Sequence, residues 1–379
     1  NTVGILYKIK NGKQPTKLTL APLMNFRDFH SMSTNHEFKI RQENKGTKLK
    51  VIIDNMIQNS IYIKVSEGIY IPHNNDIFRN MFYIEEQKRG FYPEENHAVV
   101  GRYEIEIKPN EEKEISFVCS LEENIDELDV KKLIIKEKQR ISKILEKTEI
   151  DFSEKQDKTE DEEKRQELIK NLVISADTFI AYRPSFRLHT IIAGYPWFLD
   201  WGRDSLISFE GLLLKTKRYD IAKEVLKTMM RDIKYGLVPN GYSGFDNRPL
   251  YNSVDASLLL FEQIQKYLEY TKDQEFIKEI FEKLEIIIEN YKKGIDIDNN
   301  NIYLDTDHLI VSGTENTQNT WMDAKVDGVA VTPRNGKAVE INSMWYNSLK
   351  IMENICKELR RKQKSKKICR TSKTNKKFF

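Results

Sequence analysis

Tryptophan, aspartate and arginine side chains gather in three segments of this chain, residues 194–205, 236–257 and 320–347. All four tryptophans lie in the first and third segments: Trp197, Trp201, Trp321 and Trp345. An aromatic ring stacks on the apolar face of a pyranose, and carboxylates, amides and guanidinium groups hydrogen-bond to its hydroxyls. The composition of the three segments therefore indicates sugar recognition, although each tryptophan taken singly is as readily a core residue.

The charged residues of the first segment favour the same interpretation. Asp200, Arg203 and Asp204 flank Trp201 at the start of a predicted helix. A guanidinium fork can pair with a carboxylate and still have N–H groups for substrate hydroxyls. The competing explanation is a buried ion pair that serves only the fold.

The elements that position these segments begin with a strand-rich part, residues 1–122. Its β-branched and aromatic residues partly alternate with polar ones, between clusters of Asn, Gly and Pro. The clearest strand candidates are residues 48–53, 60–65, 98–107 and 114–119. We expect an antiparallel β-sandwich as the N-terminal domain.

Residues 123–166 are rich in Glu, Asp and Lys and poor in aromatic residues. Apolar residues occur only at intervals, which predicts a charged helical linker, mobile around residues 151–163.

From residue 167 to residue 359 the pattern is helical. Apolar residues recur at helical spacing over six ranges, residues 168–179, 205–214, 219–233, 256–270, 275–291 and 341–359. Two connections, residues 236–254 and 299–340, are long and rich in Gly, Asn, Asp, Trp and Tyr. Long ordered loops beside a helical scaffold are where binding sites tend to lie.

The three segments also carry a recognisable set of motifs. The strings GYPWFLDWGRD, PLYNSVDAS, WMDAK and TPRNGKAVEINSMWYN follow one another in this order. They resemble, almost letter for letter, the C-terminal glucosidase domain of the glycogen debranching enzyme family (amylo-α-1,6-glucosidase) in its bacterial and archaeal form. The strand-rich part is similar to the family's N-terminal domain, with Arg89, Gly90 and Gly101 in the same order. The resemblance extends from about residue 22 to residue 359.

The resemblance implies a multidomain fold, an N-terminal antiparallel β-sandwich followed by an all-α (α/α)6 toroid. The helical ranges account for about half of such a toroid. In the family, a further stretch carries the rest of both helix rings and the catalytic base Glu. We therefore expect a truncated toroid at residues 167–359 that exposes apolar faces of helices such as residues 256–270. The basic tail, residues 360–379, is then expected to be disordered or non-native.

The implied activity is hydrolysis of the α-1,6-linked glucose at a branch point of glycogen, with inversion. Inversion needs a carboxylic acid to protonate the leaving oxygen and a carboxylate, roughly 6.5–9.5 Å away, to activate water. The resemblance gives the acid role to Asp323, in the WMDAK motif. The resemblance also implies that the catalytic base is not present in this chain, so we expect the chain to hydrolyse glycogen poorly.

The resemblance also implies a set of substrate-binding residues. Arg203 and Asp204 would hold hydroxyls of the terminal glucose, with Tyr195, Trp197 and Trp201 as the wall beside it. The remaining candidates are Asp200, Tyr251, Asn252, Asp255, Trp321, Lys325, Glu340 and Trp345.

Composition excludes several classes of function. Eleven of the 61 Lys and Arg residues lie in residues 357–379, and the rest of the chain is net acidic, so we expect no nucleic-acid partner. No apolar run is long enough for a membrane helix. Three cysteines and six scattered histidines indicate no disulfide framework, no metal and no cofactor. We expect a cytoplasmic protein that binds glycogen or a branched α-glucan; its oligomeric state stays open.

Two alternatives to debranching remain. The first alternative is a non-catalytic glucan-binding fragment, which keeps the sugar-contact segments but lacks the base. The second alternative is a different (α/α)6 toroid glucosidase, such as a glucoamylase acting on α-1,4 links, or a trehalase.

Overall fold

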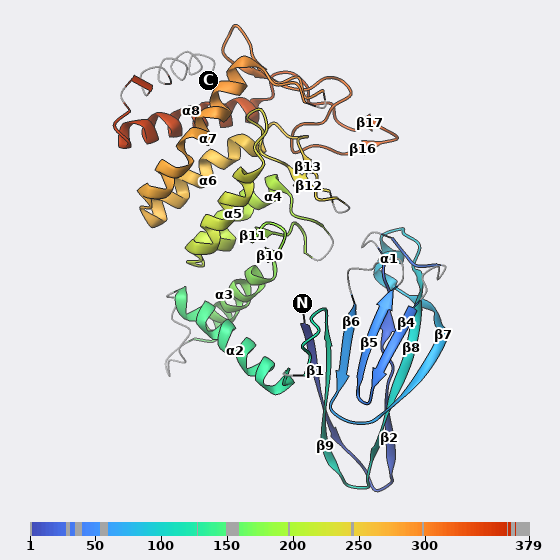
Figure 1. Cartoon of the computed structure of the whole chain (residues 1–379). Helices are drawn as coiled ribbons and strands as arrows, with labels where there is room; N and C mark the ends of the chain where they lie inside the picture. Colours follow the sequence, from blue (N-terminus) through green and yellow to red (C-terminus); the bar gives the residue numbers. More distant parts are fainter. Residues whose placement is uncertain are drawn as a thin grey trace. The chain divides into compact units, whose positions relative to one another are not determined.

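The structure is a computed structural model that divides into two compact units, unit 1 (Asn1–Ser142) and unit 2 (Lys143–Phe379). Figure 1 draws both units. The division lies inside the range expected as a linker. The structure describes residues 2–27, 31–34, 40–53, 60–126, 128–148, 159–195, 198–243, 246–297, 299–361, 363–364 and 368.

Unit 1 contains two antiparallel sheets. The first has the strand order β1-β9-β6-β5-β4, formed by β1 (Thr2–Lys10), β9 (Glu112–Ser120), β6 (Ile61–Val65), β5 (Lys48–Ile53) and β4 (Ile40–Lys45). In the second sheet the long strand β8 (Glu94–Ile107) pairs with β2 (Thr16–Leu20), β3 (Leu23–Met24) and β7 (Ile69–Phe82).

The core of unit 1 lies between these sheets. Strand β5 alternates buried Leu49, Val51 and Ile53 with partly exposed residues, as a strand with one face in a core must. Ile63 and Ile115 of the first sheet belong to the same buried cluster as Met24, Val100 and Ile105 of the second. The expected β-sandwich is therefore confirmed, and it is built from side chains of both inner faces.

The four strand candidates of the sequence correspond to β5, β6, β8 and β9, and β8 begins earlier than expected. Strand β7 was not predicted, because Pro72 and several Asn and Asp residues interrupt its apolar pattern. Its pairing with β8 shifts register between Pro72 and Asp76 and again between Phe78 and Met81. These bulges absorb the residues that argue against a strand. A short helix, α1 (Ile84–Lys88), follows it.

Two charged helices, α2 (Val130–Lys147) and α3 (Glu160–Thr178), follow the sheets in the sequence. Thr159 accepts from the backbone N–H of Glu162, and the Glu162 side chain accepts from that of Thr159, which starts α3 with a capping box. The mobility expected around residues 151–163 falls partly on residues 151–158, which lie outside the described residues.

The six predicted helices of unit 2 are all present. They are α3, α4 (Gly202–Phe209) with its π-helical continuation η1 (Glu210–Leu214), α5 (Tyr219–Arg231), α6 (Ala256–Thr271), α7 (Gln274–Lys293) and α8 (Val339–Glu358). A hairpin of β10 (Ile180–Arg183) and β11 (Leu188–Ile191) lies between α3 and α4 in the sequence. None of the described helices is long and apolar enough to cross a membrane.

Helix α6 is the centre of this unit and contacts α4, α5, α7 and α8 (Figure 1). Leu260, Phe261 and Ile264 are fully buried, and the apolar residues of the helix belong to one core cluster, whereas Glu269 is exposed. The expectation that this helix would expose an apolar face is therefore wrong. Its apolar residues pack against the neighbouring helices, and its more exposed positions, Glu262, Gln265 and Glu269, are polar, as in an amphipathic helix.

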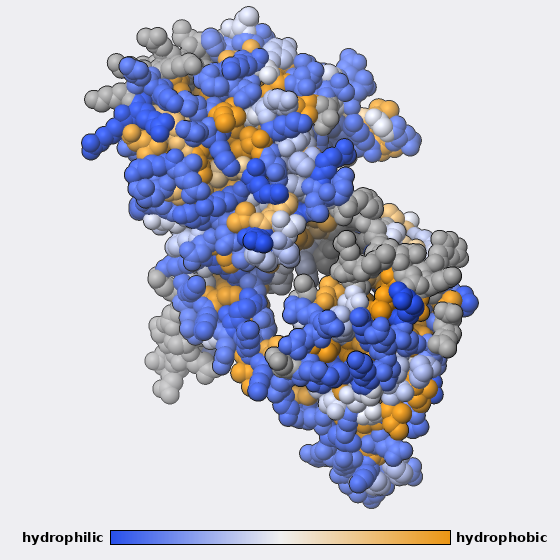
Figure 2. Space-filling view, in the orientation of Figure 1, coloured by the Kyte–Doolittle hydropathy of each residue, from blue (hydrophilic) through white to orange (hydrophobic). Residues whose placement is uncertain are grey.

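The two long connections carry short two-stranded ladders. They are β12 (Gly241–Tyr242) with β13 (Pro249–Leu250), β14 (Tyr303–Leu304) with β15 (Ile310–Val311), and β16 (Lys325–Val326) with β17 (Val329–Ala330). The β16–β17 hairpin exposes Val326 and Val329, a hydrophobic spot that is visible in Figure 2.

Described residues of the basic tail pack against α7. The guanidinium of Arg361 lies 3.9 Å from the centre of the Phe281 ring, and Lys364 pairs with Glu285 at 2.7 Å. Ile368 is buried in the core of unit 2. These described positions therefore pack against unit 2. Residues 362, 365–367 and 369–379 lie outside the described part, so a disordered or non-native tail stays a prediction for them.

The packing of β7 on β8 predicts a strict need for glycine at position 101. A Cβ there would lie 2.6 Å from the Ile71 carbonyl oxygen and 2.5 Å from the Tyr70 hydroxyl. We expect Gly101→Ala to loosen the β7–β8 pairing by about 1–3 kcal/mol. Hydrogen exchange by mass spectrometry should show faster exchange of the β7 and β8 amides. Gly12→Ala, where a Cβ meets nothing within 4 Å, is the matched control, and equal exchange in the two variants would contradict the prediction.

Candidate active site

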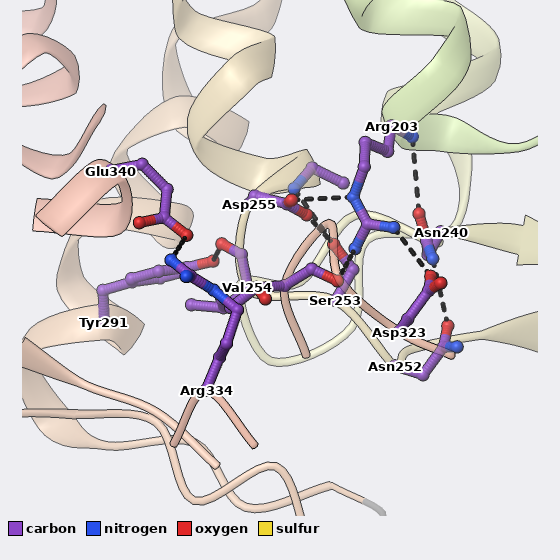
Figure 3. Close-up of polar contacts among 12 residues, drawn as sticks. Arg203, Asn240, Asn252, Ser253, Val254, Asp255, Tyr291, Asp323, Arg334 and Glu340 are labelled. Carbon is purple, nitrogen blue, oxygen red and sulfur yellow. Dashed lines mark hydrogen bonds and ion pairs between the residues drawn. The ribbon is translucent and has the colours of Figure 1, made fainter. Parts of the chain in front are cut away.

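The guanidinium of Arg203 is held by three acceptors from two different loops. Its Nε donates to Oδ2 of Asp255 at 2.7 Å, Nη1 to Oδ2 of Asp323 at 2.9 Å, and Nη2 to the Thr320 carbonyl at 2.9 Å. Figure 3 shows the guanidinium between the two carboxylates. Arg203 and Asp255 are buried, whereas the side chain of Asp323 is 48% exposed. Arg203 is thus fixed from behind and presents one carboxylate partner to solvent.

The start of α4 places this arginine. Gly202 donates its N–H to the Asn240 carbonyl at 2.8 Å, and the Arg203 N–H reaches Asn240 Oδ1 at 3.4 Å. A Cβ on Gly202 would lie 2.5 Å from the Pro239 carbonyl oxygen, so the close approach of these two loops requires glycine. The first and second sequence segments are joined at this point.

Asp255 is in turn held at the start of α6. The Ser253 hydroxyl donates to Asp255 Oδ1 and accepts from the Ala256 N–H at 3.1 Å. The Val254 N–H between them donates to the carbonyl of Asn319, the residue directly before the third segment, at 2.8 Å. The three segments that the sequence singled out therefore converge on one guanidinium.

A cavity of about 620 Å³ opens at this point of unit 2. Its wall combines aromatic and apolar groups with four charged side chains and a group of amides and hydroxyls. The lining residues are Ala193, Phe198, Trp201, Arg203, Asp204, Asn252, Asn300, Thr317, Gln318, Asn319, Asp323 and Lys325. This volume and this mixture suit a small polar ligand with one apolar face.

Asp204 is the second carboxylate of the cavity wall. Its side chain faces the cavity but is partly enclosed by protein, and this loss of water raises its pKa above the usual value. Asp323 and Asp255 add to the rise by repulsion, while Arg203 opposes it. One guanidinium thus stands among three carboxylates and hydrogen-bonds to two of them, Asp255 and Asp323.

Of the predicted site residues, Trp201, Arg203, Asp204, Asn252, Asp323 and Lys325 line the cavity. The Lys325 ammonium donates to the Asn316 carbonyl at 3.0 Å, so it is held along the wall. Tyr195 is 52% exposed and outside the lining, and Trp197 lies outside the described residues.

Asp200 and Asp255 turn inward and brace the site instead of facing the ligand. The carboxylate of Asp200 is buried against Arg183 and accepts from the Thr190 hydroxyl at 3.2 Å. A role in substrate contact is therefore wrong for Asp200 in this geometry, since both partners belong to the β10–β11 hairpin. Asp255 is buried behind Arg203 and positions it.

Tyr251 and Trp345 are also structural. The Tyr251 hydroxyl donates to the Asp232 carbonyl at 2.6 Å. Trp345 is fully buried and stacks on Tyr291, with ring centres 5.9 Å apart, so it cannot touch a ligand. Tyr291 donates to the Val254 carbonyl at 2.7 Å, and the pair therefore supports the segment that carries Asp255.

Glu340 and Trp321 are outside the lining of the cavity. Glu340 accepts from Arg334, and the guanidinium of Arg334 lies 5.6 Å from the Trp321 ring. Figure 3 shows the Arg334–Glu340 pair apart from Arg203. Trp321 remains 55% exposed, so it is a surface aromatic beside Arg334.

Sequence reasoning missed the amide-rich side of the cavity, which includes Asn300, Gln318 and Asn319. Asn240, which holds the start of α4, was missed as well. These residues precede the tryptophan motif or lie between motifs, and only their Asn and Gln content could have indicated hydroxyl binding. Among the described residues, no group of three or more His, Cys, Asp or Glu is placed to hold a metal ion.

Comparison with known families gives two matches. Residues 174–378 match the family described as "Amylo-alpha-1,6-glucosidase", and residues 1–114 match "Glycogen debranching enzyme N terminal". The glycogen debranching enzyme of Saccharomyces cerevisiae is 26% identical over 226 residues, which is 45% of this chain and 15% of the yeast protein. The chain thus aligns with only a small part of that relative.

Two solved structures are similar in outline. A putative kojibiose phosphorylase from the human microbiome gives a TM-score of 0.44 at 11% identity, covering 99% of this chain and 51% of that one. A bacterial glucoamylase complexed with acarbose gives 0.45 at 11% identity, covering 90% and 47%. This chain spans about half the length of each.

The buried ion pair predicts a large effect of Asp255→Asn. The change leaves the buried Arg203 guanidinium without its enclosed anionic partner, and breaking such a pair costs about 3–5 kcal/mol. Chemical denaturation followed by far-ultraviolet circular dichroism should show the loss in unit 2. Lys278→Gln removes an exposed ion pair on α7 and should change stability little. A loss no greater for Asp255→Asn than for this control would contradict the assignment.

Because the pKa of Asp204 is raised, we predict that Asp204→Asn increases the stability of the folded chain by an amount that depends on pH. The folded chain binds this proton more tightly than the unfolded chain, so the carboxyl favours folding at acidic pH and loses that contribution as pH rises through the folded pKa. We expect the variant to melt higher than the parent at pH 7 and the difference to vanish near pH 3.5. Asp246→Asn should do the reverse, because hydrogen bonds lower the pKa of that exposed carboxyl. A constant difference across pH in differential scanning calorimetry would refute the assignment for Asp204.

Proposed function

Because the chain belongs to the glycogen debranching enzyme family, we propose that its cavity binds the α-1,6-linked glucose at a branch point of glycogen and serves its hydrolysis with inversion. The observation that carries this proposal is the Arg203–Asp323 pair in the wall of a sugar-sized cavity. Aromatic Trp201 and Phe198 line the same cavity and offer faces for a pyranose.

Asp323 is the proton donor in this proposal. Arg203 Nη1 engages Oδ2, so in this proposal the free oxygen, Oδ1, is the one that delivers a proton to the glycosidic oxygen as the C1–O bond breaks. The Arg203 contact fixes the orientation of the carboxyl group, which is what a proton donor needs. The leaving glucan chain departs with a new hydroxyl.

Inversion also requires a carboxylate that takes a proton from the attacking water as its oxygen bonds to C1. Asp204 is the other carboxylate of the described cavity wall, and we assign it to substrate hydroxyls because it adjoins Arg203 at the start of α4. The water-activating carboxylate is therefore not assigned among the described lining residues.

Helices α3 to α8 are proposed to belong to an (α/α)6 toroid. The central position of α6 and the convergence of three loops at one cavity support this architecture. The same convergence explains why the sugar-contact residues come from connections that are far apart in the sequence.

Asp323→Asn tests the catalytic assignment. We expect the parent to release glucose from a phosphorylase-limit dextrin slowly, because the water-activating carboxylate is not assigned. Asp323→Asn should lower that release at least about 100-fold, since a general acid contributes 10²–10⁴-fold, while dextrin binding changes little. Asp327→Asn, in the turn of the β16–β17 hairpin, is the control and should keep full activity.

The outcomes of this assay separate the alternatives. Proton nuclear magnetic resonance should show β-glucose as the first product, and α-glucose would refute inversion. Faster glucose release from maltose or trehalose than from limit dextrin would favour another toroid glucosidase. Binding of dextrin with no release of glucose would favour a non-catalytic glucan-binding role.

A further inference from the structure

One amide in the wall of the cavity has no hydrogen-bond partner among the residues that the structure describes. Gln318 lines the cavity, is 9% exposed, and neither Nε2 nor Oε1 has a partner within the described structure. Buried polar groups in native proteins are nearly always paired, and each exception needs an explanation. An amide that has lost water without gaining a partner lowers the stability of the free chain.

The backbone around this side chain is fixed. The Asn319 carbonyl accepts from the Val254 N–H at 2.8 Å, and the Asn319 Nδ2 donates to the Asn300 carbonyl at 2.8 Å. On the other side, the Thr317 hydroxyl accepts from the Thr314 N–H at 2.7 Å and closes a tight turn. Gln318 is therefore held in place by its neighbours, and its own amide contributes nothing to that order.

The other amides of the wall have structural bonds. Asn252 Oδ1 accepts from Asn240 at 3.3 Å, Asn300 Nδ2 donates to the Tyr251 carbonyl, and Asn319 Nδ2 donates to Asn300. Each of them holds the wall together. Among the described lining residues, Gln318 is the amide whose two polar atoms are both left for something else.

We propose that Gln318 binds hydroxyls of the glucose unit that enters the cavity, with Nε2 as donor and Oε1 as acceptor. Neighbouring hydroxyls of a pyranose each donate and accept, so one amide can pair with two of them. Both amide atoms are shielded from solvent here, and a rotation of the flexible side chain presents them to the cavity. This inference rests on the proposed function and names a determinant of its specificity.

Gln318 lies on the same segment as the proposed acid, Asp323, so a contact between Gln318 and the sugar would help to position the sugar for proton transfer. The Thr320 carbonyl two residues later accepts from Arg203 Nη2, and Asp323 follows on the same segment. A sugar bound by Gln318 is therefore held in a defined position relative to the segment that carries the proton donor. Orientation of this kind converts binding into rate.

Gln318→Met tests the inference, because methionine keeps the length of the side chain and removes both polar atoms. Isothermal titration calorimetry on the full chain would measure binding of a maltotriose that carries one α-1,6-linked glucose. We expect affinity to fall about 10-fold, as the loss of two hydrogen bonds to neutral hydroxyls implies. The melting temperature of the ligand-free chain should stay level or rise, since an unpaired amide has been removed.

The matched control is Gln263→Met. Gln263 lies on α6, is 3% exposed, has an unpartnered Oε1 and does not line the cavity. We expect this variant to bind the oligosaccharide as the parent does. Equal weakening in both variants would overturn the inference.

The remaining outcomes separate this inference from the proposed function. If the parent binds and Gln318→Met binds equally well, the inference fails and the proposed function stands. A fall in melting temperature together with affinity would show a structural role and overturn the inference. If the parent does not bind the oligosaccharide at all, the proposed function fails and the inference fails with it.

Discussion

The enclosure of one guanidinium group sets the geometry of the site. Arg203 is buried, and a cation taken out of water is tolerated only where anions and carbonyls surround it. Its three acceptors come from residues 255, 320 and 323, so the loops that carry them must meet at the start of α4. The hydrogen bonds of Arg203 therefore hold the two separate loops together at the start of α4.

The single positive charge of Arg203 does not balance the three carboxylates around it, those of Asp204, Asp255 and Asp323. Asp255 and Asp323 take its hydrogen bonds, while Asp204 keeps a raised pKa beside them. Partial enclosure and the neighbouring carboxylates favour retention of a proton on Asp204 itself, while Asp255 and Asp323 accept from Arg203.

Several residues that resemble sugar contacts in the sequence act one layer behind the cavity. Trp345 stacks on Tyr291, and Tyr291 holds the backbone of Val254 beside Asp255. Asp200 is committed to Arg183 and Thr190. Motif membership therefore includes both the groups that face the ligand and the groups that keep them in place, because an accurate site needs rigid support.

Apolar periodicity determined the six helices and the clearest strands, because each buries a face whose spacing is written in the chain. Motif spacing also identified Trp201, Arg203, Asp204 and Asp323 as residues of one site, which the cavity brings together. Only the tertiary structure decided that Asp200 and Trp345 face inward, that β7 forms across two bulges, and that the amides near residue 318 line the wall. Side-chain direction and the enclosure of α6 depend on contacts between distant segments, and local pattern carries no information about such contacts.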